Sequence, residues 1–175
     1  MKECVRHIED SARRGDELTI EWIKDLHARM CEPGDENAGR YRKRDTSPGI
    51  YNLDVAPAAS ISYYFRKFME TYNDELIAYH PLRGAAIAHW EFMRVFPFDE
   101  RSGLVGRLMM NFILLRHNYP PAIIHATDRH HYFAALAGHR TDLVPVVVEA
   151  VGATINAAQG FSRRAATTTT HQMAL

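Results

Sequence analysis

The chain has 175 residues, of which 46% are hydrophobic and 24% charged, so it is long enough for one domain with a substantial core. Lysine plus arginine and aspartate plus glutamate each total 21, which gives a formal net charge of zero. This balance argues against broad electrostatic binding to nucleic acid or to a membrane surface, and it leaves room only for a local basic patch.

The cysteine content and the N-terminus favour a cytoplasmic protein. Cys4 and Cys31 are the only cysteines, too few for a disulfide framework, and a reducing cytosol is the simplest location for them. The first residues are charged and have no apolar centre, so they do not form a Sec-type signal peptide. We expect no apolar run of the roughly 20 residues that a membrane helix needs. Secretion as a bacterial effector by another route stays open.

The pattern predicts a first helix over residues 18–30, where apolar side chains recur at helical spacing. A loop follows, and then the basic run from Arg40 to Arg44 meets a Ser-Pro-Gly turn at residues 47–49 and Ile50-Tyr51 beyond it. Two short extended pieces around such a turn predict a small β-hairpin that leans on the helices.

The rest of the chain predicts helices, so the fold class is all-α with one small hairpin. Their apolar periodicity and their boundaries at prolines place these helices at residues 57–73, 85–95, 103–117, 128–139 and 143–158. The tail over 161–175 is polar and low in complexity, and we expect it to be disordered. No repeat or second domain is visible, so residues 1–160 form one domain.

The stretch FPFDERSGLVGR, from Phe96 to Arg107, resembles the motif H-P-F-x-(D/E)-G-N-G-R-x-x-R of the Fic (Fido) family. The resemblance extends over about residues 18–155, because further stretches of the family pattern occur in the same order. The matching motif positions are Pro97, Phe98, Glu100, Gly103 and Arg107; the further stretches are Leu26-His27, Gly39–Arg42 and Asp128-Arg129 with Tyr132. The resemblance implies a helical Fic fold around a central, motif-bearing helix pair, with the hairpin as its target-docking flap.

The resemblance also implies a reaction, for which this sequence lacks several parts. In the family the motif histidine takes a proton from a target hydroxyl, which attacks the α-phosphate of ATP so that AMP is transferred. The acidic residue holds Mg²⁺, and the glycine-rich turn with the arginines binds the phosphates. Here the histidine position is Phe96, the Gly-Asn pair is Arg101-Ser102, and the first arginine is Leu104.

Each departure has a physical consequence. Phe96 cannot accept a proton, and base catalysis is typically worth ~10²–10⁴ in rate. Arg101 places a Cβ and a long side chain where the backbone must approach a phosphate. Leu104 removes a charge-assisted phosphate contact. We therefore expect ordinary AMP transfer to be lost. ATP and Mg²⁺ are implied by the family but are not assigned here.

The candidate catalytic residues are Glu100, as acid or base, and Arg107, as an anion anchor. The pocket around them is predicted to be lined by Phe96, Phe98, Asp99, Arg101, Ser102, Gly103 and Leu104. Other roles stay open: the acids also suit a helix N-terminus, Arg101 could pair with them, and Phe96 could simply fill an unused site. A single carboxylate is weak support for Mg²⁺.

Histidines give no metal site, because no HExxH or paired-cysteine pattern is present. His89, on the predicted central helix, is expected to be a buried structural residue. His130 and His131 are adjacent and so point to different faces of a helix.

The expected flap residues are Arg40, Tyr41, Arg42, Ile50 and Tyr51. Its basic run is either a solvated strand edge or a surface that docks an acidic or extended partner by strand addition. The family's self-inhibiting S/T-x-x-x-E-G/N pattern is not found.

Three functions remain. The first is a repurposed enzyme acting on a non-ATP substrate, either a small molecule or a protein, in the Fic cleft. The second is a catalytically inactive protein that binds and regulates a partner through the flap. The third is a residual nucleotidyl- or phosphoryl-transferase. Neither nucleic acid nor a membrane is an expected partner.

Overall fold

The computed structural model describes residues 1–172, with side chains to residue 161, and the chain folds into helices joined by irregular segments. The α-helices are α1 (Lys2–Arg14), α2 (Ile20–Ala28), α3 (Ile61–Asp74), α4 (Pro81–Val95), α5 (Ser102–Arg116), α6 (Arg129–Ala137) and α7 (Leu143–Gln172). Short 3-10 turns lie at Ala58–Ser60, Leu76–Ala78 and Ala126–Asp128. The predicted all-α class is confirmed.

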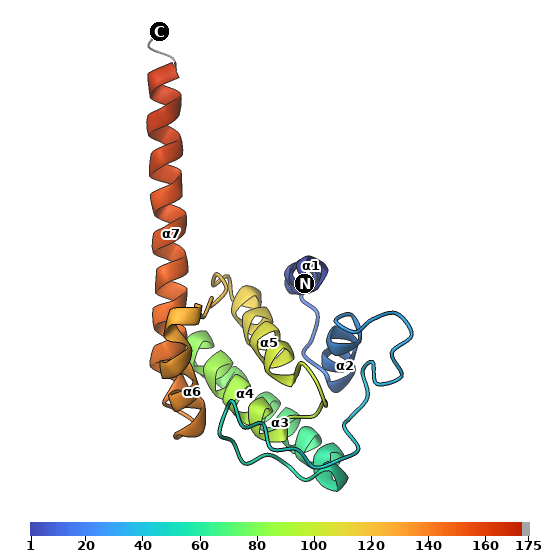
Figure 1. Cartoon of the computed structure of the whole chain (residues 1–175). Coiled ribbons are helices and arrows are strands. Elements are labelled where there is room, and N and C mark those ends of the chain that lie inside the picture. Colours follow the sequence, from blue (N-terminus) through green and yellow to red (C-terminus); the bar gives the residue numbers. More distant parts are fainter. Residues whose placement is uncertain (173–175) are drawn as a thin grey trace.

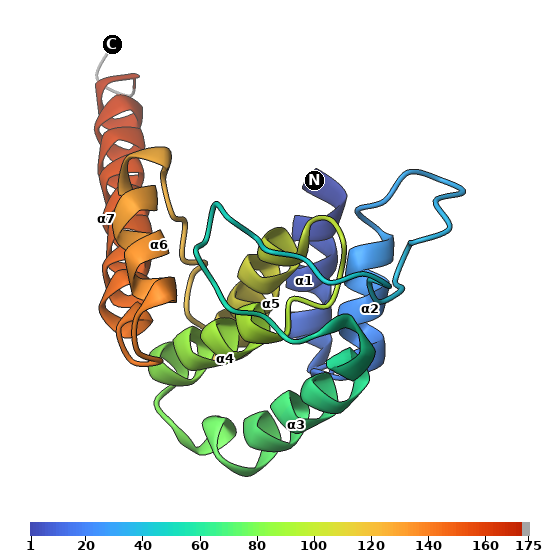
Figure 2. The same cartoon turned by 60° about the horizontal axis from the view of Figure 1, so that its bottom comes forward.

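Helix α4 lies at the centre of the body, packed against α3, α5 and α7 (Figure 2). Pro81 starts the helix at its first turn, where a missing N–H is tolerated. Small residues let neighbouring helices approach closely: a Cβ on Gly84 would lie 2.7 Å from the carbonyl oxygen of Leu76. The predicted central, buried helix is therefore found, and its C-terminal end carries the motif.

Helix α1 was not expected from the sequence. It packs against α5 and buries Cys4, Ile8 and Ser11, which recur at helical spacing among charged residues. It ends at Gly15, whose left-handed φ of 75° suits a residue without a Cβ. The apolar stripe is narrow and is surrounded by charged residues. The sequence pattern therefore did not predict this helix.

The predicted hairpin is wrong: none of the described residues forms a strand, and residues 40–56 cross the motif as an irregular segment. Instead of pairing with itself, this segment is tied to the end of α4. The Arg42 N–H donates to the Pro97 carbonyl at 2.9 Å, and the Ala56 N–H donates to the Arg94 carbonyl at 2.8 Å. We keep the name flap for residues 40–56.

Helix α7 extends well beyond the helical body (Figure 1). Its first half packs through Leu143, Val147 and Val151, which are buried. The predicted disordered tail is described only in part, because residues 161–172 continue α7 and residues 173–175 lie outside the described residues. Leu143–Phe161 is long and apolar enough to cross a membrane by length and composition, which corrects the expectation that no such run exists.

Candidate functional site

Phe96 ends α4 and fills the position where the motif histidine was expected. Its N–H donates to the Phe92 carbonyl at 3.0 Å, and its φ of 45° is in the left-handed region, uncommon for a residue with a side chain. The side chain is 7% exposed, and its ring meets the ring of Tyr51 edge-on, with centroids 6.1 Å apart. The base position therefore holds an apolar ring covered by the flap.

Ser102 closes the loop that follows. Its hydroxyl accepts a hydrogen bond from the Phe98 N–H and donates one to the Phe98 carbonyl, both at 2.9 Å. Arg101 just before it takes a left-handed φ of 62°, at a position where the motif has glycine. The Phe98 ring stacks on His27 with centroids 3.9 Å apart. These contacts make the loop a closed, packed turn.

Glu100 lies on one side of this loop. Together with Asp99 and Arg101 it is exposed, and all three line a cavity of about 390 Å³ whose other wall is built by α2 and the loop after it. Burial lowers the pKa of His27 in this wall, against the Glu100 backbone, which raises it. The His27 Nδ1 accepts from the Gly39 N–H at 3.0 Å, so the ring is a neutral, structural group.

Arg107 lies on the other side, one turn into α5. It lines a second cavity of about 250 Å³ with Tyr51, Arg129, Tyr132 and Phe133. Its guanidinium lies 6.0 Å from the centroid of the Tyr132 ring, where a cation–π attraction operates. Two arginines suit an anion in this cavity.

Tyr51 reaches from the flap to the N-terminus of α5. A Cβ on Gly103 would lie 2.1 Å from the Tyr51 hydroxyl oxygen, so the hydroxyl rests directly on the backbone of the first helical turn. The ring also meets Phe133 edge-on with centroids 5.3 Å apart. Tyr51 therefore covers the first turn of α5, the end of a helix at which backbone N–H groups can receive an anion.

His89 lies behind Arg107 and is fully buried. Its Nε2 is 2.8 Å from the Tyr132 hydroxyl, and its Nδ1 has no hydrogen-bond partner among the residues that the structure describes. Burial, with the nearby Arg107, lowers the pKa of His89 to about 3, so the ring is neutral. Burial raises the pKa of Tyr132 to about 12, so its hydroxyl keeps its proton. Both groups fit a structural role.

The two predicted catalytic residues, Glu100 and Arg107, line different cavities. Residues 1–161 contain no group of three His, Cys, Asp or Glu side chains placed to hold a metal ion. A lone Glu100 does not supply the several oxygen ligands that Mg²⁺ or Ca²⁺ prefers, so these residues do not fit a protein-held Mg²⁺.

The helical body, its motif loop and its flap match a known family. The family model of the Fic/DOC family matches residues 17–114, which is more than half of the chain. This chain belongs to the Fic/DOC family.

Two curated relatives are named as protein adenylyltransferases. One from Nematostella vectensis is 31% identical over 143 residues, covering 78% of this chain and 32% of the relative. One from Caenorhabditis elegans is 31% identical over 139 residues, covering 78% of this chain and 27% of the relative. The chain thus spans about a third of the length of these relatives.

Solved structures agree on the fold. Fic-1 (residues 134–508, E274G) from C. elegans superposes with a TM-score of 0.75 at 25% identity, covering 91% of this chain and 49% of that chain. A Fic domain-containing signaling protein from Bacteroides thetaiotaomicron gives a TM-score of 0.74 at 23% identity, covering 90% of this chain and 70% of that one, which supports the fold alone.

The flap of this Fic protein divides the predicted docking residues between two environments. Arg40 and Ile50 are exposed, whereas Tyr41 packs on Phe65 with centroids 5.7 Å apart. Arg42, predicted on the docking surface, is buried, and its guanidinium donates to backbone carbonyls around the motif. The exposed basic side chains of the flap are therefore Arg40, Lys43 and Arg44.

The remaining candidates occupy less central places. Leu104 is half-buried in the first turn of α5. His130 and His131 are both exposed on α6, and His131 lines a cavity against α7, away from Arg107. The sequence did not point to a further cavity of about 500 Å³, which lies between α3 and α4. Its only signal was the pair Glu91 and Arg94, charged residues in an otherwise buried helix.

Proposed function

We propose that this Fic-family protein does not transfer AMP by the family route, and that its motif region supports a flap that binds a protein partner. The observation that carries this proposal is the place of Tyr51. Its hydroxyl rests on the α5 N-terminus, beside Phe96 at the base position. A phosphate group and the Tyr51 ring cannot share that space.

Protein binding is supported by the flap surface and by the relatives. Lys43, Arg44 and Ile50 are exposed, and the flap is anchored from below through Arg42. The relatives are named protein adenylyltransferases, which means that they act on proteins. An anchored segment with exposed cations and an exposed apolar side chain suits an acidic segment of a partner.

A repurposed enzyme in the same cleft is the second candidate. The cavity beside Arg107 and Arg129 favours it, because two guanidinium groups can hold an anionic substrate. Glu100 faces the other cavity, so the acid or base of such an enzyme would have to come from elsewhere. We therefore place this function second.

The first test is ATP binding with Mg²⁺, measured by calorimetry. We expect no heat from the natural protein and measurable binding by the variant Tyr51→Ala, Arg101→Gly, Leu104→Arg, because the variant opens the α5 N-terminus and restores a cation. Tyr63→Ala, at an exposed tyrosine of α3, is the control and should behave as the natural protein. Equal, tight ATP binding by the natural protein and the opened variant would mean that Tyr51 does not block the site.

The second test addresses the flap. A fluorescent oligo-glutamate peptide is expected to bind the natural protein at low salt. The variant Lys43→Ser, Arg44→Ser should weaken that binding about tenfold or more, because two charge contacts are lost. Arg66→Ser with Arg83→Ser, at two exposed arginines outside the flap, removes the same two charges and is the matched control. If the control and the flap variant weaken binding equally, the effect is one of net charge, and the flap is not the docking surface.

A further inference from the structure

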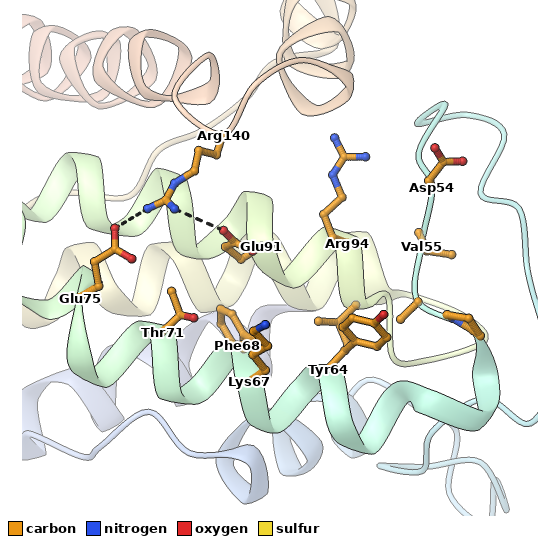
Figure 3. A pocket seen from close by; sticks show the side chains of 13 residues that line it. Asp54, Val55, Tyr64, Lys67, Phe68, Thr71, Glu75, Glu91, Arg94 and Arg140 are labelled. Atoms are coloured by element: carbon orange, nitrogen blue, oxygen red, sulfur yellow. Dashed lines mark hydrogen bonds and ion pairs between the residues drawn. The ribbon is translucent and has the colours of Figure 1, made fainter.

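A further cavity lies between α3 and α4, just before the motif. It measures about 500 Å³ and is bounded at one end by the flap residues from Asp54 onward and at the other by Arg140 (Figure 3). Its size is in the range of small-molecule sites. None of the motif residues lines it, so it is a different site from the one described above.

The walls of this cavity balance in charge. They carry three carboxylates and three cations: Asp54, Glu75, Glu91, Lys67, Arg94 and Arg140. Two of the three cations already have partners within the protein. Arg140 pairs with Glu75 at 2.6 Å, and Arg94 donates to the Leu136 carbonyl at 2.9 Å while lying over the Trp90 ring.

Within the described residues, Glu91 is held by only one long ion pair. Its side chain is 27% exposed, and its nearest cation, the Nη1 of Arg140, is 4.0 Å away. Burial raises the pKa of Glu91, as does the nearby Glu75, against the cations Arg140, Arg94 and Lys67, which lower it. A half-buried carboxylate without a hydrogen-bond donor is costly, and an ammonium group placed beside it would offset that cost.

Lys67 and Thr71 are the donors that lack partners. Both rise from α3 toward Glu91 on α4 (Figure 3). Among the residues described, neither the Lys67 ammonium nor the Thr71 hydroxyl makes a hydrogen bond or ion pair. A carboxylate with only a 4.0 Å ion pair on one helix therefore faces donors without a hydrogen bond on the next. Val55, Tyr64 and Phe68 add an apolar wall.

We propose that this cavity binds a free α-amino acid with an apolar side chain. Its ammonium group would pair with Glu91, and its carboxylate would pair with Lys67 and accept from Thr71. The side chain would lie against Tyr64 and Phe68. A ligand with a single charge is disfavoured, because the cavity presents cations and carboxylates in equal number.

Calorimetry with three probes tests this assignment on the natural protein. L-leucine carries both charges, leucinamide keeps only the ammonium, and N-acetyl-leucine keeps only the carboxylate. We expect leucine to bind and each blocked form to bind about tenfold more weakly or not at all, since each loses one charge-assisted contact. No binding of leucine, or equal binding of the three probes, would overturn the proposal.

Two variants assign the contacts. Glu91→Gln should weaken leucine and leucinamide but not N-acetyl-leucine, and Lys67→Met should weaken leucine and N-acetyl-leucine but not leucinamide. Glu70→Gln and Arg66→Met are the matched controls, because both residues are exposed on α3 and lie outside the cavity. If the controls weaken leucine as much as the cavity variants do, the site is elsewhere. Because no motif residue takes part, this result is independent of the ATP experiment.

Discussion

Acidification is expected to destabilise this protein through His89, and replacing His89 with glutamine is expected to remove that part of the loss. The His89 pKa is about 3 in the folded protein, because the ring is buried, against an ordinary value of 6.5. Between these two values the unfolded chain binds a proton at this site and the folded chain does not. The free energy of unfolding therefore falls as the pH falls through this window, and this contribution is fully present above the upper value.

The size of the effect follows from the shift. Each pKa unit is worth about 1.4 kcal/mol, so the whole window carries on the order of 4–5 kcal/mol, of which about 2–3 kcal/mol lies above roughly pH 4.5. Glutamine is the suitable replacement because its amide can still bond the Tyr132 hydroxyl, the partner of His89 at 2.8 Å.

Urea unfolding at several pH values between about 7 and 4.5 measures how the free energy of unfolding depends on pH. The natural protein should lose more stability over this range than His89→Gln does. The carboxylates, the half-buried His7 and the buried His27 are present in both proteins, so their contributions cancel in the difference. His117→Gln, at an exposed site, should follow the natural protein. Parallel curves for the natural protein and His89→Gln would show that His89 is protonated without cost in the folded state.

Apolar periodicity predicted most of the helices, because a helix that packs on a core needs one apolar face. It placed the helices before and after the motif close to the bounds of α4 and α5. It missed α1, whose buried face is only Cys4, Ile8 and Ser11. That face is meaningful only once α5 is there to receive it, and a single sequence does not show which surface will be available.

The motif located the site but not the direction of its side chains. Glu100 and Arg107 are seven residues apart along the chain, yet they line different cavities, with the left-handed residue Arg101 between them. Spacing does not encode that turn when the residue is arginine instead of glycine. Tyr51, the residue that covers the α5 N-terminus, lies about fifty residues earlier, and only the fold brings it there.

The hairpin was predicted from turn residues, and the prediction was wrong. The side chain of Arg42 ties the segment to other parts of the fold. A hairpin satisfies its backbone groups by pairing its two strands. Here the Arg42 guanidinium instead bonds the carbonyl of Arg44 in the same piece and those of Phe96 and Ala56 outside the predicted hairpin, the first two at 2.9 Å, so the piece is tied to the motif and not to a second strand. A basic run in a sequence does not reveal that one of its members is buried.

Arg42→Met is therefore expected to lower the free energy of unfolding by on the order of 3–5 kcal/mol, although methionine fills much of the same volume. The Arg42 side chain is fully buried, so the substitution leaves three carbonyl oxygens without their donor. Each unsatisfied buried acceptor costs about 1–3 kcal/mol, and such costs are not fully additive. The same substitution releases both the flap and the left-handed end of α4 at Phe96, because both are bonded to this one group.

Urea unfolding at neutral pH gives the stability change, and proteolysis within residues 43–56 reports release of the flap. Arg44→Met is the matched control. The Arg44 side chain is exposed, and the group that accepts from Arg42 is the Arg44 backbone carbonyl, which the substitution keeps. Loss of the Arg44 side chain should therefore change the free energy of unfolding little. Arg42→Lys should fall between the two, since one ammonium cannot reach three separate carbonyls as a guanidinium does. If Arg42→Met and Arg44→Met proved equally mild, the flap would be held by its backbone bonds to Pro97 and Arg94 alone.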